Sequence, residues 1–136
     1  MISLALLLAA NSFSAQPPRP AVTAWVAPWE PISPQGWECF TEINPFVFAF
    51  DSEDKIYLPY AKFLAEATAA KPPKALFVPT IVNDVFGKNG QRQMLKSVPL
   101  LNRMLKDDES INAHVDELLK LAVPYDGLEI DYEKIP

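Results

Sequence analysis

Four short apolar runs, separated by segments of helical character, constrain the fold of this 136-residue chain more than any other feature of its sequence. The runs are rich in β-branched and aromatic residues, which favour strands. The first three are apolar almost throughout, a pattern typical of strands that are covered on both faces of a parallel sheet. The predicted strands are Val22–Trp29, Asn44–Asp51, Lys74–Asp84 and Asp126–Glu133.

Helical patterns fill the intervals between these strands. Tyr57–Lys71 is rich in Ala and carries its larger apolar residues on one side. A weaker helix is predicted around Pro34–Glu42, and a short helical turn within Ser97–Glu109. The segment Ser110–Val123 has one amphipathic face, formed by Ile111, Val115, Leu118, Leu119 and Ala122.

The resulting order, β-α-β-α-β-α-β, predicts an α/β fold. Alternation of this kind implies right-handed crossovers and a parallel sheet, with the strands neighbouring in chain order and the helices outside. Two architectures remain open at this point. One is a small open sheet, and the other is the first four parallel strands of a (β/α)8 TIM barrel, which needs ~250 residues.

The fourth predicted strand carries regularly spaced acids. Because side chains alternate between the two faces of a strand, Glu129, Asp131 and Glu133 share one face, opposite the apolar residues between them. Partial burial and like-charge repulsion disfavour ionisation of all three, so one of them can hold a proton near neutral pH. A protonated acid beside an ionised one is suited to protonating a leaving oxygen, which predicts catalysis at this strand.

A divalent-metal site is the alternative for these acids. Acidic calcium loops place Gly and flexible polar residues between their ligands, whereas Leu128, Ile130 and Tyr132 intervene here. The single His114 and the single Cys39 rule out a local Cys/His zinc cluster. We therefore assign no metal ligand and no cofactor, and we expect Cys39 to be a buried thiol that has no disulfide partner within the chain.

The acidic stretch resembles the D-G-x-D-x-D-x-E signature of glycoside hydrolase family 18, the chitinase-like family. Asp126, Gly127, Asp131 and Glu133 match it, and Glu129 departs from it, because the family usually has Asp at that position. The third strand reads "FVPTIVND" where many chitinases have a small-residue S-x-G-G segment. In this respect the chain looks nearer to the bacterial branch of the family, which resembles spore-cortex and germination glycosidases.

The resemblance implies a barrel with this motif on its fourth strand, so residues 22–136 would be the truncated N-terminal half of a glycosidase domain. Glu133 would be the general acid/base, and Asp131 would orient the 2-acetamido group of the substrate. Glu129, Asp126 and Tyr132 would be supporting residues. The implied activity is substrate-assisted, retaining hydrolysis of β-linked N-acetylglucosamine glycans of the chitin or peptidoglycan type. Half a barrel on its own is expected to be inactive.

A non-catalytic, chitolectin-like sugar-binding module is the alternative function. Trp25 and Trp29 are candidates for stacking on sugar rings in either case. The predicted partner is a polysaccharide. A net charge of −5 without a basic stripe argues against nucleic acid and against an anionic membrane surface. The oligomeric state stays open.

The N-terminal residues predict export. Residues 1–15 resemble a secretory signal peptide, with an apolar run that is too short to span a membrane and with small residues before a cleavage point after Ala15. Residues 16–21 form a Pro-rich leader. The expected location is therefore outside the cell or in the periplasm or cell envelope.

Overall fold

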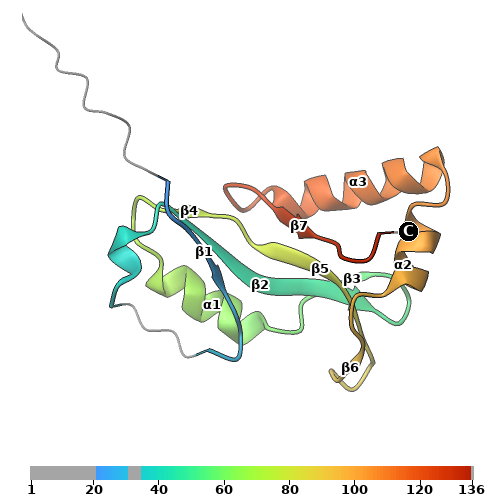
Figure 1. The fold of residues 1–136 in the computed structure, drawn as a ribbon, viewed down its shortest axis with the longest axis horizontal. Helices are drawn as coiled ribbons and strands as arrows, with labels where there is room; N and C mark the ends of the chain where they lie inside the picture. Colours follow the sequence, from blue (N-terminus) through green and yellow to red (C-terminus); the bar gives the residue numbers. More distant parts are fainter. Residues whose placement is uncertain (1–20, 31–34, 136) are drawn as a thin grey trace, which may run out of the picture.

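The predicted strands lie side by side and parallel, in the order in which they occur in the chain (Figure 1). A computed structural model describes residues 21–30 and 35–135, so the predicted signal peptide and most of the Pro-rich leader lie outside the described residues. Strand β1 (Thr23–Val26) pairs with β2 (Glu42–Asp51), β2 pairs with β5 (Thr80–Phe86), and β5 pairs with β7 (Glu129–Asp131). The α/β fold with a parallel sheet is therefore confirmed.

The third predicted strand is divided in two. Strand β4 (Leu76–Phe77) pairs with the start of β2, and β5 follows after Val78 and Pro79. Pro79 has no backbone N–H to donate to a neighbouring strand, although its carbonyl accepts a hydrogen bond from Glu129 at 2.9 Å. The prediction of one continuous strand over Lys74–Asp84 was wrong in this respect.

Two short antiparallel strands were not predicted. Strand β3 (Ile56–Tyr57) pairs with the end of β2, so helix α1 (Ala61–Ala70) begins four residues later than the predicted start at Tyr57. Strand β6 (Arg92–Met94) pairs with the end of β5. Its three residues are all exposed, so no apolar pattern marks them as a strand.

The predictions for the remaining helices differ in outcome. The weak helix around Pro34–Glu42 is only a 3₁₀ turn, η1 (Trp37–Cys39), because β2 already begins at Glu42, and Pro34 lies outside the described residues. The helical turn within Ser97–Glu109 is a full helix, α2 (Val98–Met104). Cys39 is exposed, contrary to the expectation of a buried thiol, and its Sγ donates to the Gly36 carbonyl.

Helix α3 (Asp108–Ala122) confirms the predicted amphipathic helix but not its buried face. The Asp107 side chain accepts a hydrogen bond from the Ser110 amide at 2.8 Å and caps the first turn. Of the five residues on the predicted face, only Leu118 is buried. An apolar row spaced by four residues instead faces solvent, and it comprises Ile111, Val115, Leu119 and Val123.

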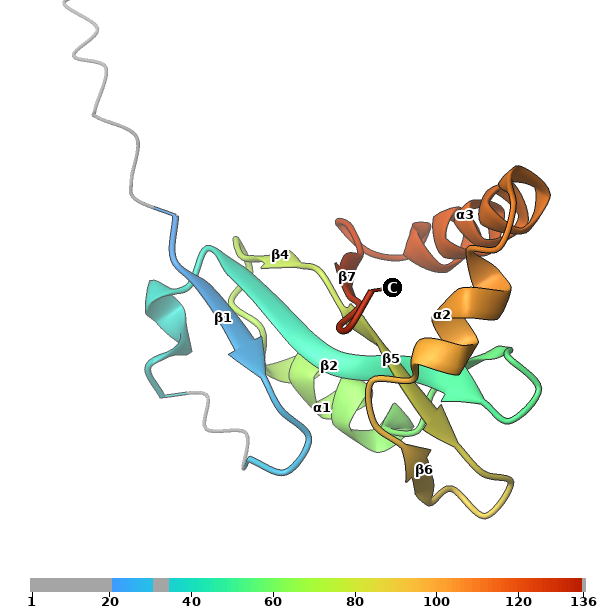
Figure 2. The same ribbon diagram turned by 45° about the vertical axis from the view of Figure 1, so that its right-hand side comes forward.

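All three helices contribute to one apolar core against β2 and β5. Phe63 comes from α1, Leu100 from α2 and Leu118 from α3. Figures 1 and 2 show α1 beside β1 and β2, and α3 beside β7. The sheet residues of this core are Val47, Phe48, Phe50 and Ile81.

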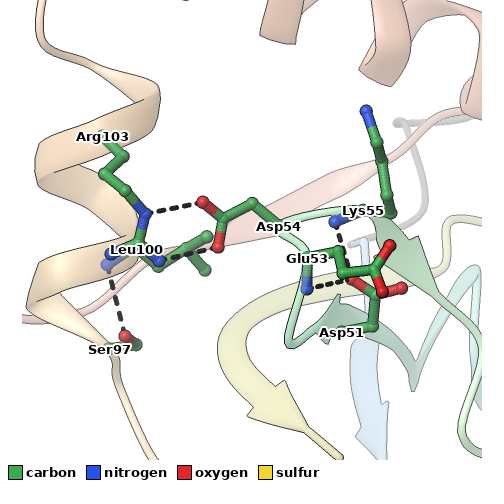
Figure 3. A network of polar contacts seen from close by, with 7 residues as sticks. All are labelled: Asp51, Glu53, Asp54, Lys55, Ser97, Leu100 and Arg103. Carbon is green, nitrogen blue, oxygen red and sulfur yellow. Dashed lines mark hydrogen bonds and ion pairs between the residues drawn. The ribbon is translucent and has the colours of Figure 1, made fainter. Parts of the chain in front are cut away.

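A polar network fastens α2 to the turn between β2 and β3 (Figure 3). Arg103 donates two hydrogen bonds to the Asp54 carboxylate, at 2.6 and 2.7 Å. Asp51 accepts the backbone amides of Glu53 and Lys55 and so closes the turn. The bidentate geometry holds the last turn of α2 near the carboxyl end of β2.

Candidate active site

A cleft of about 160 Å³ opens at the carboxyl end of the parallel strands. This volume is below the roughly 300–1,000 Å³ of pockets that enclose a whole drug-sized ligand, so the cleft would take part of a longer molecule. Asp131 and Glu133 lie in its wall together with Trp29. The carboxyl end is where parallel α/β barrels carry their active sites. The charged and amide side chains in the lining of the cleft are Asn83, Asp84, Arg92, Lys96, Asp131 and Glu133.

The carboxylate of Glu133 faces this cleft and meets a cation. Its Oε2 accepts a hydrogen bond from the Lys96 ammonium in an ion pair. Neither partner is closed off from solvent, since 44% of the Glu133 side chain and 39% of the Lys96 side chain remain exposed. Glu133 is therefore accessible to a ligand.

Asp131 is the last residue of β7 and lies level with Val82 on β5. Burial raises the pKa of the Asp131 carboxyl above its ordinary value, and the negative charges of Glu133 and Glu129 raise that pKa further. Lys96 acts in the opposite direction. Asp131 thus retains its proton to a higher pH than an isolated Asp.

Glu129 is engaged in a different network. Its two carboxylate oxygens each lie 2.8 Å from the Trp25 indole Nε1, which donates to them. The Thr80 hydroxyl donates to the same carboxylate at 2.6 Å. Trp25 also meets the Phe46 ring edge to face, with centroids 5.6 Å apart. Glu129 therefore ties β1, β5 and β7 together, and Trp25, Phe46 and Thr80 lie on its side of the sheet.

Asp126 and Tyr132, predicted as supporting residues, are not in the lining of the cleft. The Asp126 carboxylate accepts a hydrogen bond from the Phe77 amide at 2.8 Å, at the other end of β7. Tyr132 packs against the core, and its hydroxyl lies 2.8 Å from Nε2 of His114 on α3. Burial raises the pKa of Tyr132 and lowers that of His114. Both predicted residues hold β7 in place.

The two candidate stacking residues are exposed. Trp29 lines the cleft, with 67% of its surface accessible, and Trp25 has 63% accessible. The third tryptophan, Trp37, is buried in a second core cluster. The structure thus leaves Trp25 and Trp29 available to a ligand.

Four further residues of the site were not singled out from the sequence. The Asn83 side chain makes two hydrogen bonds to the backbone of Glu133: its Oδ1 accepts from the Glu133 amide, and its Nδ2 donates to the Glu133 carbonyl. Asp84 accepts the Lys96 amide at 2.9 Å and pairs with Arg92 at 3.3 Å. Asn83 and Asp84 end the third predicted strand, and that position was a usable signal. Arg92 and Lys96 carried none, because the hairpin that places them was not predicted.

Within residues 21–30 and 35–135, no cluster of three or more His, Cys, Asp or Glu side chains is arranged to hold a metal ion. Over the same residues, no helix is both long and apolar enough to cross a membrane. Comparison of the sequence with protein-family models and with curated proteins gave no match.

Proposed function

We propose that this chain forms the N-terminal half of a family 18-like glycosidase barrel, which hydrolyses β-linked N-acetylglucosamine glycans of the chitin or peptidoglycan type. The observation that carries the proposal is the position of Asp131 and Glu133. Both line one cleft at the carboxyl end of parallel strands, with the exposed ring of Trp29 in the same wall. The motif that suggested the family thus has its two principal acids beside a space that a sugar could enter.

In the proposed reaction, Glu133 protonates the glycosidic oxygen as the bond to the anomeric carbon breaks. The carbonyl oxygen of the substrate's own 2-acetamido group attacks that carbon, while Asp131 orients the acetamido group. Water then attacks the anomeric carbon and gives its proton to Glu133, so the product retains its configuration. No separate protein nucleophile is needed, which suits two acids that share one strand rather than facing each other.

Lys96 must give way to the substrate in this mechanism. Its ammonium contacts Oε2 of Glu133 in the absence of a ligand. Lys has a flexible four-carbon stem, and the exposed Lys96 side chain has room to withdraw. A glycosidic oxygen would then take its place beside Glu133.

The exposed surface of α3 and β7 supports a larger barrel. In a (β/α)8 barrel, a fifth strand would pair with β7, and the helix after β7 would lie against α3. The corresponding surfaces are apolar: Ile130 of β7 is 52% exposed, and Leu119 and Val123 on the uncovered row of α3 are 62% and 81% exposed. Exposed apolar patches of this kind mark interaction surfaces, and in the proposed barrel the further strand and helix would cover them.

A sugar-binding module is the second candidate. The ion pair between Lys96 and Glu133 favours it, because a Glu133 that stays paired would not protonate a leaving group. The exposed Trp25 and Trp29 would still provide stacking surfaces for a sugar. The same cleft would then bind a glycan without cleaving it.

The test combines binding and cleavage. We would titrate two proteins with chito-oligosaccharides by calorimetry: this chain, and the eight-strand protein that the proposal implies, in which four further strands follow residue 136. For both we would measure the reducing ends released from chito-oligosaccharides and from purified peptidoglycan. The glycosidase proposal predicts that the extended protein both binds and cleaves, and that this chain cleaves little, because positioning supplies much of the rate. Binding without cleavage by the extended protein would support the sugar-binding module. Neither binding nor cleavage would contradict both candidates.

A further inference from the structure

Asn83 connects three segments at the edge of the cleft. It is 1% exposed and lies in the middle of β5. Its Oδ1 accepts a hydrogen bond from the Glu133 amide and its Nδ2 donates to the Glu133 carbonyl, both at 3.0 Å. Its own backbone carbonyl accepts a hydrogen bond from the Ser97 amide at 2.7 Å. One buried residue therefore holds Glu133 and also the residue that follows Lys96.

These bonds begin where the pairing of β5 with β7 stops. The last paired residues are Val82 and Asp131, so Glu133 lies beyond the strand. A neighbouring strand would offer the backbone one donor and one acceptor, and the side-chain amide of Asn83 has both. Asn83 thus fixes the backbone of Glu133 where the sheet no longer does.

Lys96, the ion-pair partner of Glu133, is held by Asp84, the residue that directly follows Asn83. Asp84 accepts a hydrogen bond from the Lys96 amide at 2.9 Å. Lys96 has a φ of 51°, and Lys134, directly after Glu133, has a φ of 56°. Left-handed backbone is uncommon for residues other than Gly and persists where surrounding contacts enforce it, often at functional sites. Strained backbone therefore accompanies both members of the ion pair.

We infer that Asn83 is a positioning residue that holds the backbone of Glu133 so that its carboxyl group faces the cleft beside Asp131. This inference rests on the proposed role of Glu133 as proton donor. Both polar atoms of the Asn83 side chain are bonded to Glu133, so Asn83 acts through Glu133 rather than on the glycan. A displacement of about 1 Å in a reacting group can cost roughly 10²-fold in rate, which is the effect that the clamp prevents.

The first measurement tests the clamp without any need for catalysis. In the full chain, we would compare amide hydrogen exchange at Glu133 in wild type, Asn83→Ala and the matched control Asn44→Ala. Asn44 is also buried, at 2% exposure, but it lies on β2, and its amide donates to Glu42. Exchange at Glu133 should rise about tenfold or more in Asn83→Ala alone, after correction for global stability. No rise, or an equal rise in both variants, would overturn the clamp.

The second measurement separates positioning from a merely structural role. In the eight-strand protein, Asn83→Ala should lower kcat by roughly 10–100-fold and leave KM nearly unchanged, because the interaction is needed for proton transfer rather than for binding. Asn83→Asp keeps the acceptor for the Glu133 amide and should recover part of the exchange protection and part of kcat. Equal kcat values in Asn83→Ala and Asn44→Ala would refute the positioning role.

The two proposals fail in different ways. If the wild-type protein releases no reducing ends, the glycosidase proposal is wrong, and exchange at Glu133 still decides whether Asn83 holds that residue. If wild type cleaves the glycan and exchange at Glu133 does not respond to Asn83→Ala, the glycosidase proposal stands and the clamp is wrong.

Discussion

Glu129 and Glu133 lie four residues apart and differ in every contact they make. Glu129 accepts hydrogen bonds from the Trp25 indole and the Thr80 hydroxyl, and these bonds tie three strands together. Glu133 is fixed through its backbone, while its carboxylate meets only an exposed ammonium among the contacts described here. In the proposed glycosidase, Glu129 would therefore stabilise the site, whereas the carboxylate of Glu133 would be able to react with the substrate.

The largest effect should come from removing the acid at Glu133. In the eight-strand protein, Glu133→Gln should lower turnover of chito-oligosaccharides by ~10²-fold or more, because general acid catalysis is typically worth roughly 10²–10⁴. Release of reducing ends measures this, with Glu129→Gln as the matched control. Unchanged turnover in Glu133→Gln would remove the proposed difference between the two acids.

The next effect should appear in stability rather than turnover. Glu129→Gln removes the charge that accepts the Trp25 and Thr80 hydrogen bonds, and it should cost about 1–3 kcal/mol of unfolding free energy. Glu133→Gln breaks only an exposed ion pair and should cost less than about 1 kcal/mol. Urea unfolding of both variants checks the contrast, and equal losses would contradict it.

A third prediction concerns Asp131, which lies between these two acids. Its pKa is raised in the folded state. Between the ordinary pKa of Asp and this raised pKa, the folded state therefore binds more protons than the unfolded state, and stability falls as the pH rises through this range. Asp131→Asn should therefore be more stable than wild type at neutral pH. The advantage should disappear below the ordinary Asp pKa of about 3.9. Thermal melts across this range test the sign.

Asp54 provides the opposite control, away from the cleft. The hydrogen bonds from Arg103 hold the pKa of Asp54 below its ordinary value, so its contribution is present at neutral pH and is lost as the pH falls through the lowered pKa. Asp54→Asn should therefore be less stable than wild type at neutral pH and should approach it in acid. The same sign in Asp54→Asn and Asp131→Asn would contradict this account of their surroundings.

The smallest effect is expected at Lys96. Lys96→Met removes the cation from Glu133 but leaves the bonds of Asn83 to the Glu133 backbone in place. The unfolding free energy should change by less than about 1 kcal/mol, as for other exposed ion pairs. Exchange at the Glu133 amide should stay at the wild-type rate. Faster exchange in Lys96→Met would mean that the ion pair, rather than Asn83, fixes this residue.

The sequence predicted those parts of the fold that depend on local pattern. Apolar runs located the strands, and the alternation of strands and helices predicted their parallel order. The short strands β3 and β6 were missed, because pairing with β2 and β5, rather than an apolar pattern, determines them. The buried face of α3 was also misjudged, since periodicity gives an apolar side but does not show what covers it.

For the candidate site, the sequence likewise predicted the local pattern but not the long-range contacts. Period-two alternation put Glu129, Asp131 and Glu133 on one face, but it could not distinguish the acid bound by Trp25 from the acid that faces the cleft. That distinction depends on contacts across 104 residues of sequence. Asn83 was not predicted, because its role depends on hydrogen bonds to Glu133, which lies 50 residues further along the chain.

The most direct test of the proposed chemistry compares two substrates in the eight-strand protein. One is a chito-oligosaccharide, and the other is the same oligomer with its acetyl groups removed, so that the acetamido carbonyl is absent. The account predicts that the first substrate is cleaved and that its initial product is the β-anomer, as detected by proton NMR. The second substrate should not be cleaved. Comparable cleavage of both substrates, or initial formation of the α-anomer, would contradict it.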